Sequence, residues 1–319
     1  MGTIVSVQSF SPDQISAIQA ALPDFGFVDA SGLDAETARK QLKSAEIILG
    51  WNRDVKKTLF EEGIALKWLQ NLGAGVDHIP LDRIQALGAV LTNASGVHPF
   101  QISESIFAML LSLTRGVHRA VRSQLERKWQ PSKSLGEAHG KTIAIVGAGA
   151  IGLETAKIAK AFGMRVIGVR RSGAPAEGVD EMADLAKLNE VLAQSDYVIN
   201  CLPLTSETRF LFGQAEFEAM KPTAYYINIG RGATTDTAAL LSALRDGRIA
   251  GAGLDVFEQE PLPEDHPLWT LENVILTPHE AGNTDSYIER ALDIVLDNLA
   301  EYRSCGSPKR NVVDLNAQY

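Results

Sequence analysis

The chain has 319 residues, long enough for two domains, and 45% of them are hydrophobic and 22% charged, as in ordinary soluble globular proteins. No apolar run approaches the roughly 18 residues that a membrane helix needs. The formal net charge is −9, so we expect no binding to nucleic acids or to anionic membranes.

Cys201 and Cys305 are the only cysteines, which argues against a disulfide framework and a cysteine zinc site. No other cluster of metal-ligating residues is visible, so we predict no metal. The start MGTIVSVQSF lacks the basic, then apolar, then small-residue pattern of a signal peptide. These features predict a cytoplasmic protein.

The first 97 residues alternate short apolar runs with helix-like stretches. The helix-like stretches include residues 11–22 and 34–43, and the apolar runs are TIVSV, FVDA, EIILGW, LKWLQNLG and AVLTNAS. Strands separated by helices predict βαβ units and a parallel sheet.

A long helical pattern over residues 101–128, preceded by Pro99, separates this series from a second one. The second series of apolar runs is KTIAIVGAGAIG, MRVIGVR, DYVINCLP, AYYINIG, GAGLDV and VILTP. A last helical pattern covers roughly residues 285–303. The predicted fold class is therefore α/β, with two doubly wound, Rossmann-like parallel-sheet domains.

Gly147, Gly149 and Gly152 form G-x-G-x-x-G directly after the apolar run TIAIV, and the helix-compatible stretch LETAKIAKAFG follows. Such glycines permit a tight turn, close approach to a pyrophosphate and close helix–sheet packing, and the helix N-terminus attracts phosphates. Glycine-rich turns are common, but here strand, glycines, helix and second strand occur in the required order. We therefore predict dinucleotide binding at these glycines and at Ala150 and Ile151.

The end of the next strand distinguishes two dinucleotides, because a carboxylate there accepts the ribose hydroxyls of NAD and an arginine pairs with the 2′-phosphate of NADP. The sequence reads VIGVRRSG, with Arg170 lying 18 residues beyond Gly152 and followed by Arg171 and Ser172. Two guanidinium groups and a hydroxyl suit a phosphate. We predict NADP(H), with NAD(H) at lower affinity; the alternative is two surface arginines without a ligand.

Three polar residues follow successive apolar runs of the second series: Arg231 after YYINIG, Glu260 after GLDVFEQ and His279 after VILTP. Ligands of open α/β sheets bind outside the carboxyl ends of the strands. A cation, a carboxylate and an imidazole at three such ends suit an anionic carbonyl substrate. Taken singly, each residue is as easily an exposed turn or packing residue.

Several motifs follow one another over roughly residues 45–300: LQNLGAGVDHIPL, LTNASGVHPFQISESIFAMLLSL, GAGAIG, NCLPLTSETRFLF, INIGRGATTDTAALLSAL, GAGLDVFEQEPLP and ILTPHEAG. In this order they resemble the D-isomer-specific 2-hydroxyacid dehydrogenase family. The departure from the family's familiar pattern is Arg170, where an acid is expected; this puts a preference for NAD in doubt and leaves the chemistry unaffected.

The resemblance implies a role for each residue that matches a family motif. Arg231 would clamp the carboxylate and carbonyl oxygen of the substrate, and His279 would be the general acid in reduction and the base in the reverse direction. Glu260 would orient His279 and stabilise its protonated form. The backbone at residues 74–76 would hold the substrate carboxylate; these residues are Ala74, Gly75 and Val76.

The resemblance also implies cofactor contacts and a domain arrangement. Asp255 matches a residue near the nicotinamide carboxamide, and the other positions lining the cofactor are Cys201, Leu202, Pro203, Thr208, Ile229 and Gly282. A discontinuous, flavodoxin-like substrate-binding domain would comprise residues 1–98 and 285–319, and a dinucleotide-binding Rossmann domain residues 99–284. The stretch 101–128 would supply much of a homodimer interface, or it is an ordinary core helix.

The substrate expected first is glyoxylate or hydroxypyruvate, reduced to the D-2-hydroxy acid with NADPH. Alternatives are phosphoglycerate, bulkier branched or aromatic 2-keto acids, and a nucleotide-sensing corepressor that turns over no metabolite. Five residues have either a role near the substrate or a packing role, which the sequence leaves open: Trp51, Arg53, His98, Phe100 and Trp269.

Overall fold

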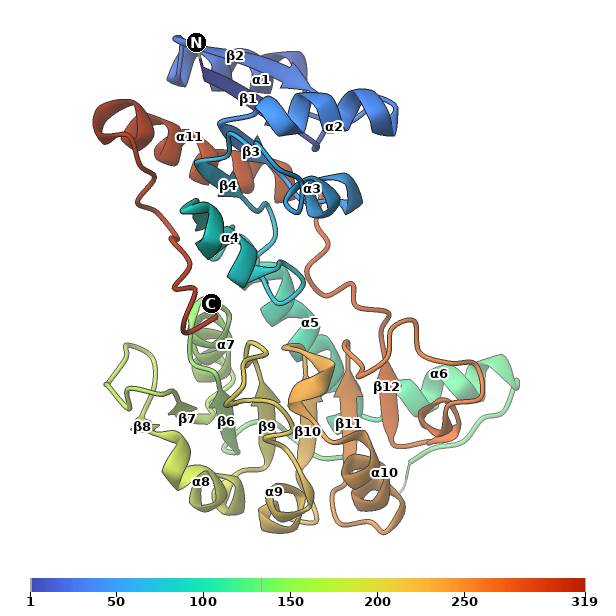
Figure 1. Cartoon of the computed structure of the whole chain (residues 1–319). Coiled ribbons are helices and arrows are strands. Elements are labelled where there is room, and N and C mark those ends of the chain that lie inside the picture. Colours follow the sequence, from blue (N-terminus) through green and yellow to red (C-terminus); the bar gives the residue numbers. More distant parts are fainter. Residues whose placement is uncertain (1, 133, 319) are drawn as a thin grey trace. The chain divides into compact units, whose positions relative to one another are not determined.

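The computed structural model describes residues 2–132 and 134–318. The chain divides into two compact units, one formed by Met1–Val97 with Thr284–Tyr319 and the other by His98–Asn283. These junctions differ by one residue from the predicted ones at 98/99 and 284/285. The first unit combines two segments that are far apart in the sequence, coloured blue to teal and red in Figure 1.

The first unit is built on a five-stranded parallel sheet. The strand order is β2-β1-β3-β4-β5, the flavodoxin-like order of doubly wound folds. The strands are β1 (Gly2–Ser6), β2 (Phe25–Asp29), β3 (Ile47–Leu49), β4 (Trp68–Gln70) and β5 (Val90–Thr92). The buried pattern of β3 and β4 on both faces reflects helices packed on either side, as parallel sheets require.

Helices cover both faces of this sheet. Helices α1 (Pro12–Ala21) and α11 (Tyr287–Cys305) pack together over one hydrophobic cluster. Helices α2 (Ala35–Ser44), α3 (Arg53–Thr58) and α4 (Leu81–Leu87) contribute to the cluster on the other face. Since α11 comes from the end of the chain, the first unit is discontinuous in sequence.

The second unit is built on a seven-stranded parallel sheet in the order β12-β11-β10-β9-β6-β7-β8. The strands are β6 (Thr142–Val146), β7 (Arg165–Val169), β8 (Glu181–Ala183), β9 (Tyr197–Asn200), β10 (Tyr225–Asn228), β11 (Gly251–Leu254) and β12 (Val274–Leu276). The order reverses between β6 and β9, the switch point at which Rossmann folds bind ligands. The predicted α/β class with two doubly wound sheets is confirmed.

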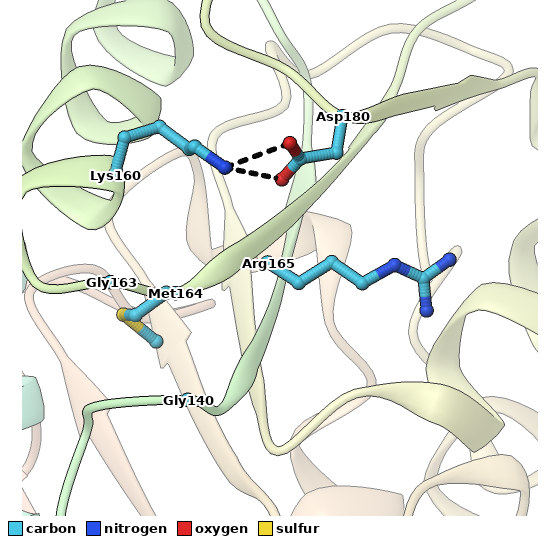
Figure 2. Close-up of a pocket in the computed structure, with 6 residues that line it drawn as sticks. All are labelled: Gly140, Lys160, Gly163, Met164, Arg165 and Asp180. Carbon is cyan, nitrogen blue, oxygen red and sulfur yellow. Dashed lines mark hydrogen bonds and ion pairs between the residues drawn. The ribbon is translucent and has the colours of Figure 1, made fainter.

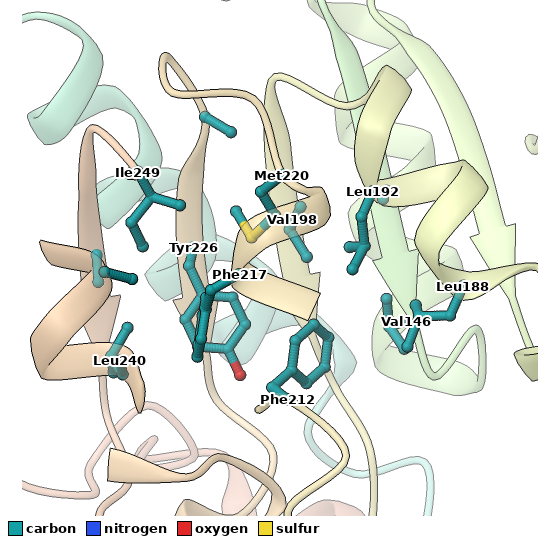
Figure 3. Close-up of a cluster of buried hydrophobic side chains, with 14 of the residues drawn as sticks. Val146, Leu188, Leu192, Val198, Phe212, Phe217, Met220, Tyr226, Leu240 and Ile249 are labelled. Atoms are coloured by element: carbon teal, nitrogen blue, oxygen red, sulfur yellow. The ribbon is translucent and has the colours of Figure 1, made fainter. Parts of the chain in front are cut away.

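One face of this sheet is covered by α5 (Pro99–Thr114) and α7 (Ala150–Ala161). The other is covered by α8 (Leu188–Gln194), α9 (Gln214–Ala219) and α10 (Thr237–Arg245). Figure 3 shows the cluster on this second face, where Phe212 and Phe217 lie beside Tyr226 with ring centroids 4.9 and 5.4 Å from it. Such rings contribute much of the apolar surface that holds helices to a sheet.

The helical pattern over residues 101–128 is two helices in the structure, α5 and α6 (Val117–Leu125), and not one. Gly116 between them has a φ of +67°, a left-handed conformation that glycine adopts without strain and that ends a helix. Helix α5 is a core helix, whereas no residue of α6 is buried. None of the helices described is long and apolar enough to span a membrane.

Candidate active site

The three predicted catalytic residues follow three neighbouring strands of the seven-stranded sheet. Arg231 lies in the loop after β10, Glu260 in the loop after β11 and His279 in the loop after β12. Because these strands are parallel, their carboxyl ends meet at one edge of the sheet. The loops that follow them therefore share that edge with the glycine turn after β6.

His279 and Glu260 form a hydrogen-bonded pair. His279 Nδ1 lies 2.7 Å from Glu260 Oε2, and the two side chains are 47% and 35% exposed. The other carboxylate oxygen accepts the backbone N–H of Phe257 at 2.9 Å, so the carboxylate is anchored in its own loop. Because a carboxylate only accepts hydrogen bonds, His279 Nδ1 carries a proton, and Nε2 is the atom able to exchange a proton with a substrate.

Asp255 holds the turn that carries His279. Its carboxylate is 2% exposed and accepts the Thr277 hydroxyl at 2.6 Å and the N–H groups of Glu280 and Ala281 at 3.0 Å each. His279 has a φ of +53°, a conformation that a non-glycine residue adopts only when its surroundings impose it. The donors of these three hydrogen bonds lie on both sides of His279, so the buried carboxylate imposes this conformation.

Arg231 lies in a loop that packs tightly against the loop after β11. Its Nη1 donates to the carbonyl of Gly230 at 2.8 Å, and its own carbonyl accepts the Thr234 hydroxyl at 2.6 Å. A Cβ on Gly232 would stand 1.9 Å from the carbonyl carbon of Phe257, so only glycine fits. Phe257 is also the residue that donates to Glu260, which links the two loops mechanically.

Two buried asparagines that the sequence analysis did not single out hold these loops. Asn200 and Asn228 end β9 and β10 in register with each other. Asn200 Nδ2 donates to the hydroxyls of Tyr226 and Thr234 at 2.9 and 2.8 Å, and Asn228 Nδ2 to Thr235 at 3.1 Å. The sequence feature that could have identified them is the shared ending of the apolar runs YVIN and YYIN, each of which closes with an asparagine.

The glycine turn has the geometry that a dinucleotide requires. Gly147 has a φ of +97°, and a Cβ there would lie 2.8 Å from the carbonyl carbon of Cys201. A Cβ on Gly152 would lie 2.8 Å from the Gly147 carbonyl oxygen. At Gly149 a Cβ would meet no described atom within 4 Å, so this side of the turn is open. Ala150 and Ile151 form the first turn of α7, whose N–H groups favour an anion.

Most other predicted cofactor residues lie in loops at the same edge. Thr208 closes the loop after β9, since its hydroxyl donates to the Pro203 carbonyl at 2.6 Å. Burial raises the pKa of the Cys201 thiol to about 12, so this thiol stays neutral at physiological pH. Leu202 and Ile229 are buried, and the carbonyl of Gly282 accepts Gln101 Nε2 at 3.2 Å.

The predicted phosphate-binding arginines follow β7, and Arg170 is engaged with its own loop. Its Nε donates to the Ala174 carbonyl at 2.9 Å and its Nη2 to the Pro175 carbonyl at 2.8 Å. Arg171 and Ser172 are exposed at the tip of the loop. Arg170 therefore shapes the loop that presents its two neighbours.

In the first unit, Ala74, Gly75 and Val76 lie in the loop after β4. The Trp51 ring stands edge-on to His78, with centroids 5.8 Å apart. Arg53 is an exposed residue of the first turn of α3.

The remaining residues with open roles belong to the second unit. His98 precedes α5 and Phe100 is exposed in its first turn. Trp269 donates Nε1–H to the Pro263 carbonyl at 2.8 Å, which indicates a role in holding its own loop.

Figure 2 shows a hollow at the amino ends of the strands of the seven-stranded sheet, opposite to the end that carries His279 and the glycine turn. It is lined by Lys160, Arg165 and Asp180 among others, and the Lys160 ammonium pairs with both oxygens of Asp180 at 2.7 and 2.9 Å. Arg165 begins β7. Because ligands of such sheets bind at the carboxyl ends of the strands, this hollow is not the candidate site.

Residues 107–281 match the model of the D-isomer specific 2-hydroxyacid dehydrogenase family, NAD binding domain. The chain belongs to this family. A glyoxylate reductase of Aeropyrum pernix is 40% identical over 252 residues, which cover 76% of this chain and 75% of the relative. A D-3-phosphoglycerate dehydrogenase of Methanocaldococcus jannaschii is 33% identical over 301 residues, 92% of this chain. The match covers 56% of that relative, so the chain spans little more than half of its length.

Solved structures of family members resemble the whole chain. A family protein from Aeromonas salmonicida has a TM-score of 0.86 and 36% identity, with 98% of this chain and 99% of that chain covered. An NADPH-dependent glyoxylate/hydroxypyruvate reductase from Sinorhizobium meliloti, in complex with NADP and sulfate, has a TM-score of 0.83 and 29% identity, with both chains covered completely. The predicted family is confirmed, and with it a nicotinamide cofactor.

Proposed function

We propose that this family member reduces small 2-keto acids, glyoxylate and hydroxypyruvate first among them, to D-2-hydroxy acids with NADPH. The observation that carries the proposal is the 2.7 Å contact between His279 Nδ1 and Glu260 Oε2 at the strand edge that also bears the glycine turn. Relatives named glyoxylate reductase support the substrate class.

The proposed chemistry assigns one task to each charged residue. His279 gives the proton on Nε2 to the carbonyl oxygen as negative charge develops there, and takes it back in the reverse reaction. Glu260 keeps the ring oriented through Nδ1 and stabilises the imidazolium. Arg231 pairs with the substrate carboxylate and carbonyl oxygen, where a guanidinium offers fixed donors to developing charge.

The second unit is proposed to bind the dinucleotide. When bound, the reduced nicotinamide supplies the hydride for the carbonyl carbon. The open side of Gly149 and the first turn of α7 fit a pyrophosphate. The lining residues proposed are Cys201, Leu202, Pro203, Thr208, Ile229, Asp255 and Gly282.

A preference for NADP is proposed from the loop after β7. Arg170, Arg171 and Ser172 are the residues assigned to the 2′-phosphate, and no carboxylate lies among them. The NADP complex of the Sinorhizobium relative supports this assignment. Arg170 contributes chiefly by holding the loop through its bonds to the carbonyls of residues 174 and 175.

The first unit is proposed to bind the substrate. The backbone N–H groups of Ala74, Gly75 and Val76 are assigned to the substrate carboxylate. A set of backbone N–H groups in a loop forms a concavity that binds anions without needing a charged side chain.

The test is the oxidation of NADPH and NADH followed by absorbance. Each cofactor is combined with glyoxylate, hydroxypyruvate, pyruvate, phenylpyruvate and a branched 2-keto acid. Turnover with NADPH well above that with NADH, greatest for the two small acids, is the expected result. Tight NADPH binding without turnover of any acid would overturn the proposal in favour of a nucleotide sensor.

A homodimer is proposed through α6. Val117, Val121 and Leu125 recur every fourth residue and are 48%, 50% and 81% exposed, and Trp129 just beyond the helix is 96% exposed. An apolar stripe of this kind on a surface helix is typical of a protein interface. Sedimentation should give twice the chain mass for the wild type and the chain mass for Leu125→Glu; a monomeric wild type would refute the dimer.

A further inference from the structure

The carbonyl groups of the loop after β4 are held by side chains from neighbouring segments. Asn71, the first residue after β4, donates both hydrogens of its Nδ2, to the carbonyls of Gly73 and Gly75 at 2.9 Å each. The hydroxyl of Tyr287 on α11 donates to the Leu72 carbonyl. A buried amide with both donors used is fully committed to the conformation of this loop.

Asn93, which follows β5, is hydrogen-bonded to the remaining carbonyl of this loop, that of Ala74. Its Nδ2 donates to Ala74 at 2.8 Å, while its Oδ1 accepts the N–H of Ser95 at 3.0 Å. Asn311 in turn donates to the carbonyls of Asn93 and Ser95 at 3.2 and 2.8 Å. The hydrogen bonds at position 93 therefore require both a donor and an acceptor on one side chain, which only an amide of this length supplies.

The hydrogen bonds to these carbonyls determine the direction of the N–H groups in the same peptide units. In a trans peptide unit the C=O and the following N–H are antiparallel. The carbonyls of residues 72–75 share peptide units with the N–H groups of residues 73–76, so each N–H is directed away from the donor that holds its carbonyl.

Among the described residues, no backbone carbonyl accepts a hydrogen bond from the N–H group of any of residues 73–76. Val76 is buried and residues 73–75 are half-buried. Half-buried N–H groups left unpaired in a row are costly, and a row of them forms a concavity for an anion.

We propose that Asn71 and Asn93 are positioning residues for the substrate carboxylate. They aim the N–H groups of the loop by holding its carbonyls, without touching the substrate themselves. The inference rests on the proposed function, because the carboxylate is that of the 2-keto acid. It adds a determinant of substrate affinity that lies wholly in the first unit and is separate from the charged residues of the second.

The experiment compares Asn71→Ala and Asn93→Asp with Tyr302→Phe. Asn93→Asp retains the acceptor for Ser95 and replaces the donor toward Ala74 with a carboxylate oxygen. Tyr302→Phe removes a hydrogen bond of 2.9 Å to Glu46, which precedes β3 and so lies at the other edge of the same sheet, and thus controls for a loss of stability alone.

We expect both asparagine variants to raise the KM for glyoxylate at least ten-fold and to change the KM for NADPH less than two-fold. Tyr302→Phe should change neither KM by more than two-fold. Equal KM values for glyoxylate in the asparagine variants and in Tyr302→Phe would overturn the inference.

Binding of oxalate, measured by calorimetry in the presence of NADPH, separates this inference from the proposed function. Oxalate presents a carboxylate and cannot be reduced in this assay. One outcome is that the wild type binds oxalate but reduces no keto acid, and that Asn71→Ala weakens oxalate binding at least ten-fold. This outcome would refute the proposed function and support the role of Asn71 in positioning the carboxylate-binding loop. A wild type that neither turns over nor binds oxalate would refute both.

Discussion

At the carboxyl edge of the seven-stranded sheet the loops present ionisable side chains, namely Arg231, Glu260 and His279. At the corresponding edge of the five-stranded sheet, the loop after β4 presents backbone N–H groups held in place by neutral amides. An imidazole can gain and lose a proton near neutral pH, whereas a peptide N–H cannot. If the proposed function holds, the two units divide the work: side chains of the seven-stranded unit transfer the proton, and backbone N–H groups of the five-stranded unit bind the substrate carboxylate.

The largest effect is expected at His279. His279→Ala should lower keto-acid turnover about 10²–10⁴-fold, the usual contribution of a general acid, and leave the Kd for NADPH nearly unchanged. Steady-state kinetics and fluorescence titration measure the two quantities. His139→Ala, at the other edge of the same sheet, should retain wild-type turnover; turnover retained equally by both variants would rule out the acid–base assignment.

The next largest effect is expected at Asp255. Asp255→Asn leaves one oxygen for three donors, so we expect a loss of about 1–3 kcal/mol in the free energy of unfolding. Because the turn that carries His279 loosens, kcat should fall at least about ten-fold, since small displacements of catalytic groups are costly. Denaturant unfolding and kcat are measured on the same sample. A rise in the KM for NADPH with kcat unchanged would instead support a role confined to cofactor binding.

A smaller effect is expected at Arg171. Arg171→Ala should lower the ratio of kcat/KM for NADPH to that for NADH about ten-fold or more, because charge-assisted hydrogen bonds to the phosphate are lost. Arg165→Ala, at the opposite end of β7 and paired there with Glu181 at 2.6 Å, should leave the ratio unchanged. An unchanged ratio in Arg171→Ala would contradict the assignment of this loop to the 2′-phosphate.

The smallest effect is expected at Cys201, an ionisable residue of the same edge that takes no part in the proposed chemistry. Burial raises the pKa of its thiol to about 12, so at pH 8 very little of the nucleophilic thiolate is present. Iodoacetamide at pH 8 should label the exposed Cys305 and leave Cys201 and the activity intact. Peptide mass spectrometry after labelling checks this, and rapid loss of activity with labelling at Cys201 would contradict it.

Several features were predictable because they depend on local sequence. The glycine turn from Gly147 to Gly152 is an example: the left-handed φ of Gly147 and the close packing of Gly152 against β6 each require a residue without a side chain. The strand ends that bear Arg231, Glu260 and His279 were also found from the order of apolar runs, since parallel strands bring such ends to one edge.

Other features were not predicted, because the sequence pattern at each of them fits more than one structure. The break at Gly116 was missed because the apolar periodicity of α5 continues into α6. The engagement of Arg170 with its own loop was missed because an arginine at that position suits both a phosphate and a backbone carbonyl. Asn71 and Asn93 were overlooked because an asparagine after a strand is typical of any turn.

The sequence by itself determined the α/β class, the glycine turn and the residues at the strand ends. These features depend on apolar periodicity and on which residue follows each strand, and both are properties of neighbouring positions in the sequence. Only the tertiary structure decided which groups those residues bond to: Asp255 to the turn around His279, Asn200 to the loop after β10, and Asn93 to the loop after β4. A buried polar group must find a partner, and which partner it finds depends on how the strands are ordered in the sheet.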